Sequence, residues 1–132
     1  MLSSRATTTT CATSFAQFAA VEALKGPQDF VKKMLGEYGV RRKTTVKLLR
    51  EIDGVKCPDP KGAFYAFPDV SSFGKSDREI SKELLQIGVT LTPGSPFGPG
   101  GEGHVRVSYA TGLKDIVEGT RRLRNYFDAL SR

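Results

Sequence analysis

The sequence predicts an α/β fold: a small, mostly antiparallel sheet covered by helices, with a long helix on its N-terminal side. Two patterns indicate this fold. Short apolar runs typical of strands occur at four places, near residues 55–57, 63–67, 89–92 and 104–110. Segments in which apolar residues recur at helical spacing separate and flank these runs. With 132 residues, the chain is long enough for one domain with one core.

The N-terminal half predicts two helices. Thr13 or Ser14 can cap the first, which ends at Gly26. The second runs over residues 27–52 and would be about 38 Å long. Its apolar stripe consists of Phe30, Val31, Met34, Leu35, Tyr38, Val46, Leu49 and Ile52. Residues 1–12 are polar and are expected to be flexible, so the domain is assigned to residues 13–132.

Two more helices are predicted in the C-terminal half. Ser76 caps a helix over about 77–87, and Glu79 completes a capping box there. The last helix runs from residue 112 to residue 130. Its apolar face consists of Leu113, Ile116, Val117, Leu123, Phe127 and Leu130.

Charge and cysteine content argue against several function classes. The net charge is +6, but the basic residues, densest at 41–43 and 121–124, are interleaved with acidic ones along helices. They come with no RNA-binding or helix-turn-helix pattern, so we expect no nucleic-acid partner. Cys11 and Cys57 lack Cys-x-x-Cys spacing, which predicts free thiols, no metal site and a cytoplasmic location. No run reaches the roughly 18 apolar residues of a membrane span, so no membrane partner is expected.

One arginine stands in the middle of the last predicted strand. Val105, Val107 and Tyr109 alternate with polar residues, of which Arg106 is the central one. An unpaired charge in such a strand is unfavourable, and the planar guanidinium suits bidentate binding of a carboxylate. Two partners are open at this point: an Asp or Glu of this protein, or the carboxylate of a small substrate.

The segments around Arg106 carry a resemblance to a known family. They are the alanine-rich helix SFAQFAAVEAL at 14–24 followed by Arg41-Arg42, then GAFYAFPD at 62–69, GVTLTPGSPFG at 88–98 and GHVRVSYA at 103–110. In this order and spacing they resemble the C-terminal third of class I/II aminotransferases, the pyridoxal-phosphate enzymes of fold type I. The bacterial and archaeal aspartate-aminotransferase branch is the nearest. The resemblance covers about residues 3–128.

The resemblance implies a function. The chain would be the small domain of an enzyme that moves an amino group between an amino acid and a 2-oxo acid. Residues 27–52 would form the inter-domain helix of that enzyme. Related enzymes with other outcomes, such as lyases, stay open. In the family, the arginine matching Arg106 binds the α-carboxylate of the substrate. The aromatic residue matching Phe64 lines the substrate side of the pocket, although core packing is the other interpretation of Phe64. Pyridoxal phosphate, a homodimer and the large domain of the same enzyme are implied as cofactor and partners.

Two further segments match the family less specifically. Ser95 and Phe97 lie in a loop near the pocket mouth, where a structural turn is the alternative. Residues 7–10 resemble a segment that reaches the cofactor region of the neighbouring subunit, and a solvated threonine run is the alternative.

Several family features have no match in this chain. The family forms its Schiff base through a lysine upstream of this region, next to an arginine for the cofactor phosphate, and nothing at residues 1–5 matches. The acidic partner of the pyridinium nitrogen is missing too. We therefore expect no catalytic and no cofactor-binding residue in this chain, and a fragment that is inactive alone. His104 is the only histidine, which excludes histidine-based triads, and it is predicted at the surface. Asp69 and Asp77 are predicted as turn and capping residues.

A second hypothesis belongs to a different class of protein. The chain would then be the aminotransferase-like module of a transcriptional regulator with an N-terminal winged helix, or a remnant retained for assembly. The N-terminal residues, rich in Ser, Thr and Ala with Arg5 as the one charge among residues 1–21, also resemble an organelle transit peptide. Sequence upstream of Met1 would distinguish these possibilities.

Overall fold

The computed structural model describes residues 11–131, so the expectations for residues 7–10 and for most of 1–12 lie outside the described residues. The chain divides into two compact units, with the boundary between Met34 and Leu35. This boundary falls inside helix α3 (Asp29–Arg50), which corresponds to the long helix expected at 27–52. Gly36 and Gly39 lie in α3 without interrupting it.

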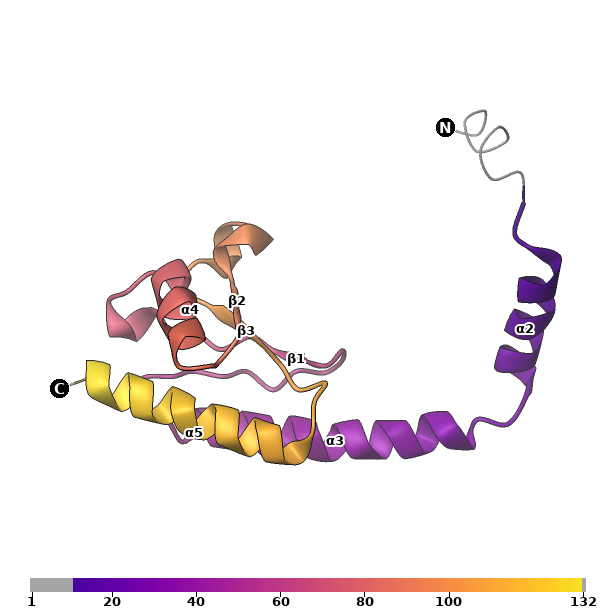
Figure 1. Ribbon diagram of the computed structural model, residues 1–132, viewed down its shortest axis with the longest axis horizontal. Helices are drawn as coiled ribbons and strands as arrows, with labels where there is room; N and C mark the ends of the chain where they lie inside the picture. Colours follow the sequence, from indigo (N-terminus) through magenta and orange to yellow (C-terminus); the bar gives the residue numbers. More distant parts are fainter. Residues whose placement is uncertain (1–10, 132) are drawn as a thin grey trace. The chain divides into compact units, whose positions relative to one another are not determined.

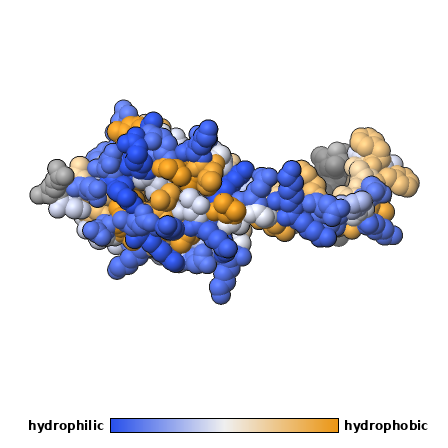
Figure 2. Space-filling model, turned by 90° about the horizontal axis from the view of Figure 1, so that it is seen from below, coloured by the Kyte–Doolittle hydropathy of each residue, from blue (hydrophilic) through white to orange (hydrophobic). Residues whose placement is uncertain are grey.

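The N-terminal unit contains helix α2 (Ser14–Lys25) and the first residues of α3. The Thr13 side chain makes no capping hydrogen bond, and α2 ends where the Gly26 N–H donates to the carbonyl of Glu22. No residue of α2 is buried, and Phe15, Phe18 and Leu24 are 77%, 79% and 83% exposed. Apolar surface on this unit is visible in Figure 2.

The C-terminal unit is built around a sheet of three strands within the described residues (Figure 1). Strand β3 (Val105–Ser108) lies between β1 (Tyr65–Ala66) and β2 (Thr92–Pro93) and is antiparallel to both. Isolated bridges join Lys56 to Asp69 and Asp69 to His104. The predicted fold class, a small antiparallel sheet with helices, is confirmed.

The strands are shorter than predicted, and one is displaced. Val89 was expected in a strand at 89–92, but its N–H donates to the Leu84 carbonyl and its side chain packs in the core just after helix α4 (Asp77–Gln86). Residues 55–57 form only the bridge at Lys56, although Val55 and Cys57 are buried. In both places the alternation of apolar residues reflects burial more than strand pairing, which is limited to the bridge at Lys56.

The core lies between the sheet and three helices: the C-terminal half of α3, α4 and α5 (Leu113–Leu130). In Figure 1, α5 and the C-terminal half of α3 run side by side, with the strands and α4 on one side of them. An ion pair of 2.8 Å from Arg124 to Glu51 joins α5 to the end of α3. The largest fully buried side chains include Leu49, Ile80, Leu84, Tyr109 and Phe127.

Two predicted apolar faces are only partly buried. In the α3 stripe, Val46 and Leu49 are buried, whereas Phe30 and Leu35 are 77% and 62% exposed. On α5, Leu113 and Val117 are also exposed, whereas the polar residue Thr120 is buried. The Thr120 hydroxyl donates a hydrogen bond to the carbonyl of Ile116. Helical spacing identifies an apolar face but not which part of it another element covers.

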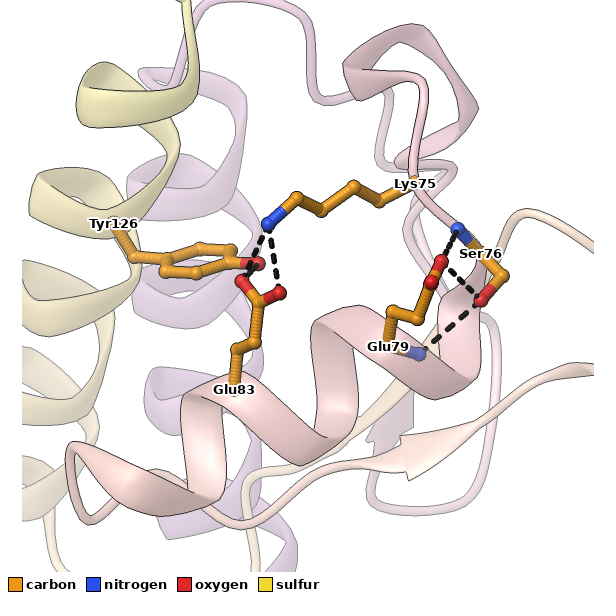
Figure 3. A network of polar contacts seen from close by, with 5 residues as sticks. All are labelled: Lys75, Ser76, Glu79, Glu83 and Tyr126. Atoms are coloured by element: carbon orange, nitrogen blue, oxygen red, sulfur yellow. Dashed lines mark hydrogen bonds and ion pairs between the residues drawn. The ribbon is translucent and has the colours of Figure 1, made fainter.

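The capping box and a second polar network hold α4 in place (Figure 3). The Glu79 N–H donates to the Ser76 hydroxyl and the Ser76 N–H donates to the Glu79 carboxylate, which confirms the predicted capping box. On the next turn of α4, Glu83 accepts hydrogen bonds of 2.7 Å from Lys75 and from the Tyr126 hydroxyl of α5.

Candidate functional site

The strand register brings Arg106 together with residues from both neighbouring strands. Thr92 of β2 lies directly across from Arg106, and Tyr65 of β1 lies across from Ser108, two residues further along β3. Because side chains alternate between the two faces of a sheet, Tyr65, Thr92 and Arg106 share one face. Val105, which is buried, belongs to the opposite face.

Arg106 is half-buried, and its guanidinium makes three contacts on this face. Its Nη2 donates to the Thr92 hydroxyl over 3.3 Å. Its central carbon lies 4.4 Å from the ring centroid of Tyr65 and 4.9 Å from that of Phe97. None of the ion pairs found among residues 11–131 involves Arg106. Within these residues, an internal carboxylate partner is therefore not observed.

Phe97 reaches Arg106 from a tightly built loop between β2 and β3. It ends a short 3-10 turn, Ser95–Phe97, and its ring packs edge-on against Phe67 at 6.0 Å. Gly94 and Gly101 lie against each other in this loop. A Cβ atom on Gly94 would collide with the Gly101 carbonyl and stand 2.7 Å from the His104 carbonyl oxygen.

The buried carboxylate of Asp77 anchors the same loop to the start of α4. Its Oδ2 accepts a 2.8 Å hydrogen bond from the Ser95 N–H, and Arg78 Nε donates to the Ser95 hydroxyl over 3.1 Å. Burial alone would raise the pKa of Asp77, but the hydrogen bonds from Ser95 outweigh it and hold this pKa below its ordinary value. Asp77 was predicted only as a capping residue at the start of its helix. Its bond to a loop 18 positions away is the feature that the sequence did not indicate.

Phe64 lies beside this cluster and is 40% exposed, which does not fit plain core packing. Its ring contacts Tyr65 at 4.5 Å and Tyr38 at 6.2 Å between centroids. Ala63 before it has a positive φ of 57°, and its carbonyl accepts a 3.1 Å hydrogen bond from the buried Tyr109. Phe64 is thus connected to the site through Tyr65, and it is the Tyr65 ring that contacts the Arg106 guanidinium.

The other titratable candidates have structural roles. Asp69 accepts hydrogen bonds from the Ser71 hydroxyl and N–H, which lower its pKa, so the predicted turn role is confirmed. His104, which was predicted at the surface, is half-buried, and its ring stacks on Phe67 with centroids 5.2 Å apart. Its Nδ1 lies 2.9 Å from the carbonyl oxygen of Glu102 in the β2–β3 loop.

A separate cavity of about 200 Å³ lies on the other face of β3, where Val107 lines it together with Leu91, Ile116 and Leu123. The hydroxyls of Thr45 and Thr120 at its wall bond to their own helices. Across residues 11–131 no group of His, Cys, Asp and Glu is arranged to hold a metal ion. Nor does that part of the chain contain a helix long and apolar enough to cross a membrane.

Sequence reasoning identified Arg106, Phe64 and Phe97 but missed Tyr65 and Thr92 as contacts of the arginine. Tyr65 and Phe64 both belong to GAFYAFPD, and only the β1–β3 register decides which of them lies on the arginine face. The pairing of Thr92 with Arg106 depends in the same way on how the loop between β2 and β3 closes.

Comparison with known proteins shows the family of this chain. The family model "Aminotransferase class I and II" matches residues 2–119. The aspartate aminotransferase of Pyrococcus horikoshii is 43% identical over 113 residues, which cover 83% of this chain and 29% of that protein. The crystal structure of the aromatic aminotransferase from Pyrococcus horikoshii OT3 is also similar, with a TM-score of 0.89 and 38% identity. The match covers 95% of this chain and 34% of the aromatic aminotransferase chain.

Aspartate aminotransferase from Thermus thermophilus with maleate is similar as well, with a TM-score of 0.83 and 32% identity over 93% of this chain and 32% of that chain. The chain thus spans about a third of the length of the relatives that it matches. The resemblance found in the sequence is confirmed: the chain belongs to the class I and II aminotransferases.

Proposed function

We propose that this chain is the C-terminal part of a pyridoxal-phosphate-dependent aminotransferase and that Arg106 binds the carboxylate of its amino-acid and 2-oxo-acid substrates. The observation that carries the proposal is a half-buried guanidinium with no ion-pair partner among residues 11–131, held against two aromatic rings. Charged side chains in such positions are normally paired, so a carboxylate ligand is the natural counter-ion.

The comparisons support the same assignment. The Thermus thermophilus relative is described with maleate, a dicarboxylate, and the relatives named above are aminotransferases, which favours an enzyme over a regulator module. In this proposal Phe64 extends the aromatic wall from Tyr65 along the substrate side. The large domain of the same enzyme and a second subunit complete the active site, and the enzyme works in the cytoplasm.

The described residues around Arg106 do not form a pyridoxal phosphate site by themselves. Tyr65, Thr92 and Phe97 contact the guanidinium, and this set contains neither a lysine to bind the cofactor nor an acid to pair with its ring nitrogen. The cofactor supplies the electron sink of amino-group transfer when it is bound. What this chain supplies is the substrate anchor: by fixing the carboxylate, Arg106 orients the rest of the amino acid.

A chimera tests the proposal. The region of the Pyrococcus horikoshii aspartate aminotransferase that matches this chain would be replaced by residues 11–131, and transamination would be measured. We expect Arg106→Ala to lower kcat/KM by about two to three orders of magnitude, with part of the loss in kcat. Arg106→Lys should recover little, because it lacks the planar fork.

Arg124→Ala is the matched control, since this arginine forms an ion pair with Glu51 and not with any residue around Arg106, so its loss should leave turnover unchanged. A large fall in melting temperature with near-normal turnover in Arg106→Ala would show that Arg106 is a structural residue and would refute the assignment. The chain alone is expected to show neither transamination nor a pyridoxal phosphate absorbance band that borohydride removes.

A further inference from the structure

We propose that Tyr65, Phe97 and Thr92 are positioning residues that hold the Arg106 guanidinium in one orientation, and that Asp77 acts on this arrangement through Ser95. The arrangement leaves the in-plane N–H groups of the arginine for a flat carboxylate. We call Tyr65, Thr92 and Phe97 around Arg106 the clamp. The identity of its ligand rests on the proposed function, whereas the geometry of the clamp does not.

Contacts reach Arg106 from the strands on both sides of β3. Tyr65 belongs to β1, while Thr92 belongs to β2 and Phe97 to the turn after it. These two strands flank β3 on opposite edges. An arginine side chain has many rotamers, and each one lost on binding weakens the complex. Restricting them in the free protein removes that loss before the ligand arrives.

These contacts leave two nitrogen atoms of the Arg106 guanidinium available to a ligand. Attraction between a cation and an aromatic ring acts through the ring face and uses none of the N–H groups. Nη2 donates one hydrogen bond to Thr92, whereas Nε and Nη1 of Arg106 donate to no residue between 11 and 131. The open donors lie in the guanidinium plane, which matches the two oxygens of a planar carboxylate.

Phe97 is 54% exposed, but the loop that carries it is held in place by hydrogen bonds. Asp77 Oδ2 accepts the Ser95 N–H at 2.8 Å, and the Phe97 N–H donates to the Gly94 carbonyl at 2.8 Å. The turn that carries Phe97 is therefore tied at its start to a buried carboxylate of α4. Asp77 touches neither Arg106 nor its ligand in this arrangement and acts only by holding the loop.

The clamp is tested on the 132-residue chain by nuclear magnetic resonance of the Arg106 Nε–Hε group, assigned by its loss in Arg106→Lys. We expect an order parameter of about 0.8 in the wild type and below about 0.6 in Tyr65→Leu and in Phe97→Leu, on the scale that separates rigid from flexible groups. Tyr65→Phe keeps the ring and should keep the high value. Phe30→Leu, an equivalent change in the N-terminal unit, is the control.

Titration of the chimera and its variants with maleate measures the consequence for binding. The dissociation constant should rise about three- to tenfold in Tyr65→Leu and Phe97→Leu and stay within about twofold in Tyr65→Phe and Phe30→Leu. Asp77→Asn should weaken maleate binding more than Glu79→Gln. Both changes remove one negative charge from the first turn of α4, but only Asp77 bonds to the loop.

These experiments can refute the clamp and the proposed function independently of each other. Unchanged order parameters in both leucine variants would overturn the clamp, even if maleate still binds through Arg106. An ordered Arg106 in a chimera that does not bind maleate would refute carboxylate binding while the clamp stands. If Tyr65→Leu does not fold, Phe97→Leu decides, because the exposed ring of Phe97 can be removed without opening the core.

Discussion

The hydroxyl of Tyr126 donates a 2.7 Å hydrogen bond to Glu83 Oε2, joining α5 to α4 across 43 positions of sequence. Lys75 donates to both oxygens of the same carboxylate, so Glu83 is the centre of the network in Figure 3. The bonds from Lys75 and Tyr126 lower the pKa of Glu83. Burial and the neighbouring Glu83 carboxylate raise the pKa of Tyr126 well above its ordinary value, which keeps the phenol a donor.

Tyr126→Phe removes only this hydroxyl and is expected to lower the melting temperature by a few degrees, because Glu83 loses a charge-assisted hydrogen bond. Thermal unfolding followed by circular dichroism measures the change. Tyr38→Phe is the matched control, since the Tyr38 hydroxyl forms no hydrogen bond with any residue from 11 to 131. Equal melting temperatures for Tyr126→Phe and the wild type would mean that the bond between the helices contributes nothing.

The lowered pKa of Glu118 is expected to make the stability of the fold depend on pH in the acid range. The hydrogen bonds from Arg121 and Arg122 lower its pKa from 4.5 to about 2. A carboxylate whose pKa is lower in the folded state stabilises the fold above its unfolded pKa, and this stabilisation is lost as the pH falls through the folded value. The loss from this group therefore falls between about pH 4.5 and about pH 2.

Glu118→Gln should accordingly make the melting temperature less dependent on pH within that window and lower it slightly at neutral pH. Glu102→Gln is the control, because Glu102 has no ion-pair partner within the described stretch of the chain. A pH profile of Glu118→Gln that parallels the wild type would contradict the assignment of this window to Glu118.

Gly94→Ala tests the close approach inside the β2–β3 loop. Its Cβ would collide with the Gly101 carbonyl, so the loop must open, and we expect the free energy of unfolding to fall by about 1–3 kcal/mol. Gly100→Ala is the control, since nothing lies within 4 Å of a Cβ at that position. Urea denaturation compares the two variants, and equal stability would show that the loop relaxes freely.

The exposed apolar surface of α2 predicts self-association. Phe15, Phe18 and Leu24 are each more than three-quarters exposed, and such surface normally lies in an interface. Sedimentation velocity should show oligomers whose proportion grows with concentration, and Phe15→Glu with Leu24→Glu should restore the monomer. Gln17→Glu adds a charge to the same helix at a polar position and should not. A wild-type chain that stays monomeric at high concentration would argue against the interface.

Local features of this protein could be predicted from the sequence. The capping box of Ser76 and Glu79, the start of α4 and the turn at Asp69 follow from residues within a few positions of each other, because the groups that bond are brought together by the backbone conformation of one segment. The strand around Arg106 was predicted for the same reason, since period-2 alternation is a local property.

Tertiary packing decided the rest. The alternation near Val89 and Val55 predicted strands where the structure has buried side chains and, apart from the bridge at Lys56, no strand pairing. The stripe of α3 gave no sign that Leu35 would be exposed while Leu49 is buried. These outcomes depend on which element covers each face. Helical or strand periodicity indicates that a face is apolar, but it does not indicate which other element packs against that face.

The candidate site shows the same division. Sequence alone identified Arg106 as a charge that needs a partner, and the family resemblance implied a carboxylate. Only the register of β3 against β1 and β2 placed Tyr65 and Thr92 beside it, and only closure of the loop through Gly94, Asp77 and Ser95 brought Phe97 to the guanidinium. A one-residue shift of register would turn every side chain of β3 to the other face. The chemistry of the arginine is thus a property of the sequence, and its surroundings are a property of the fold.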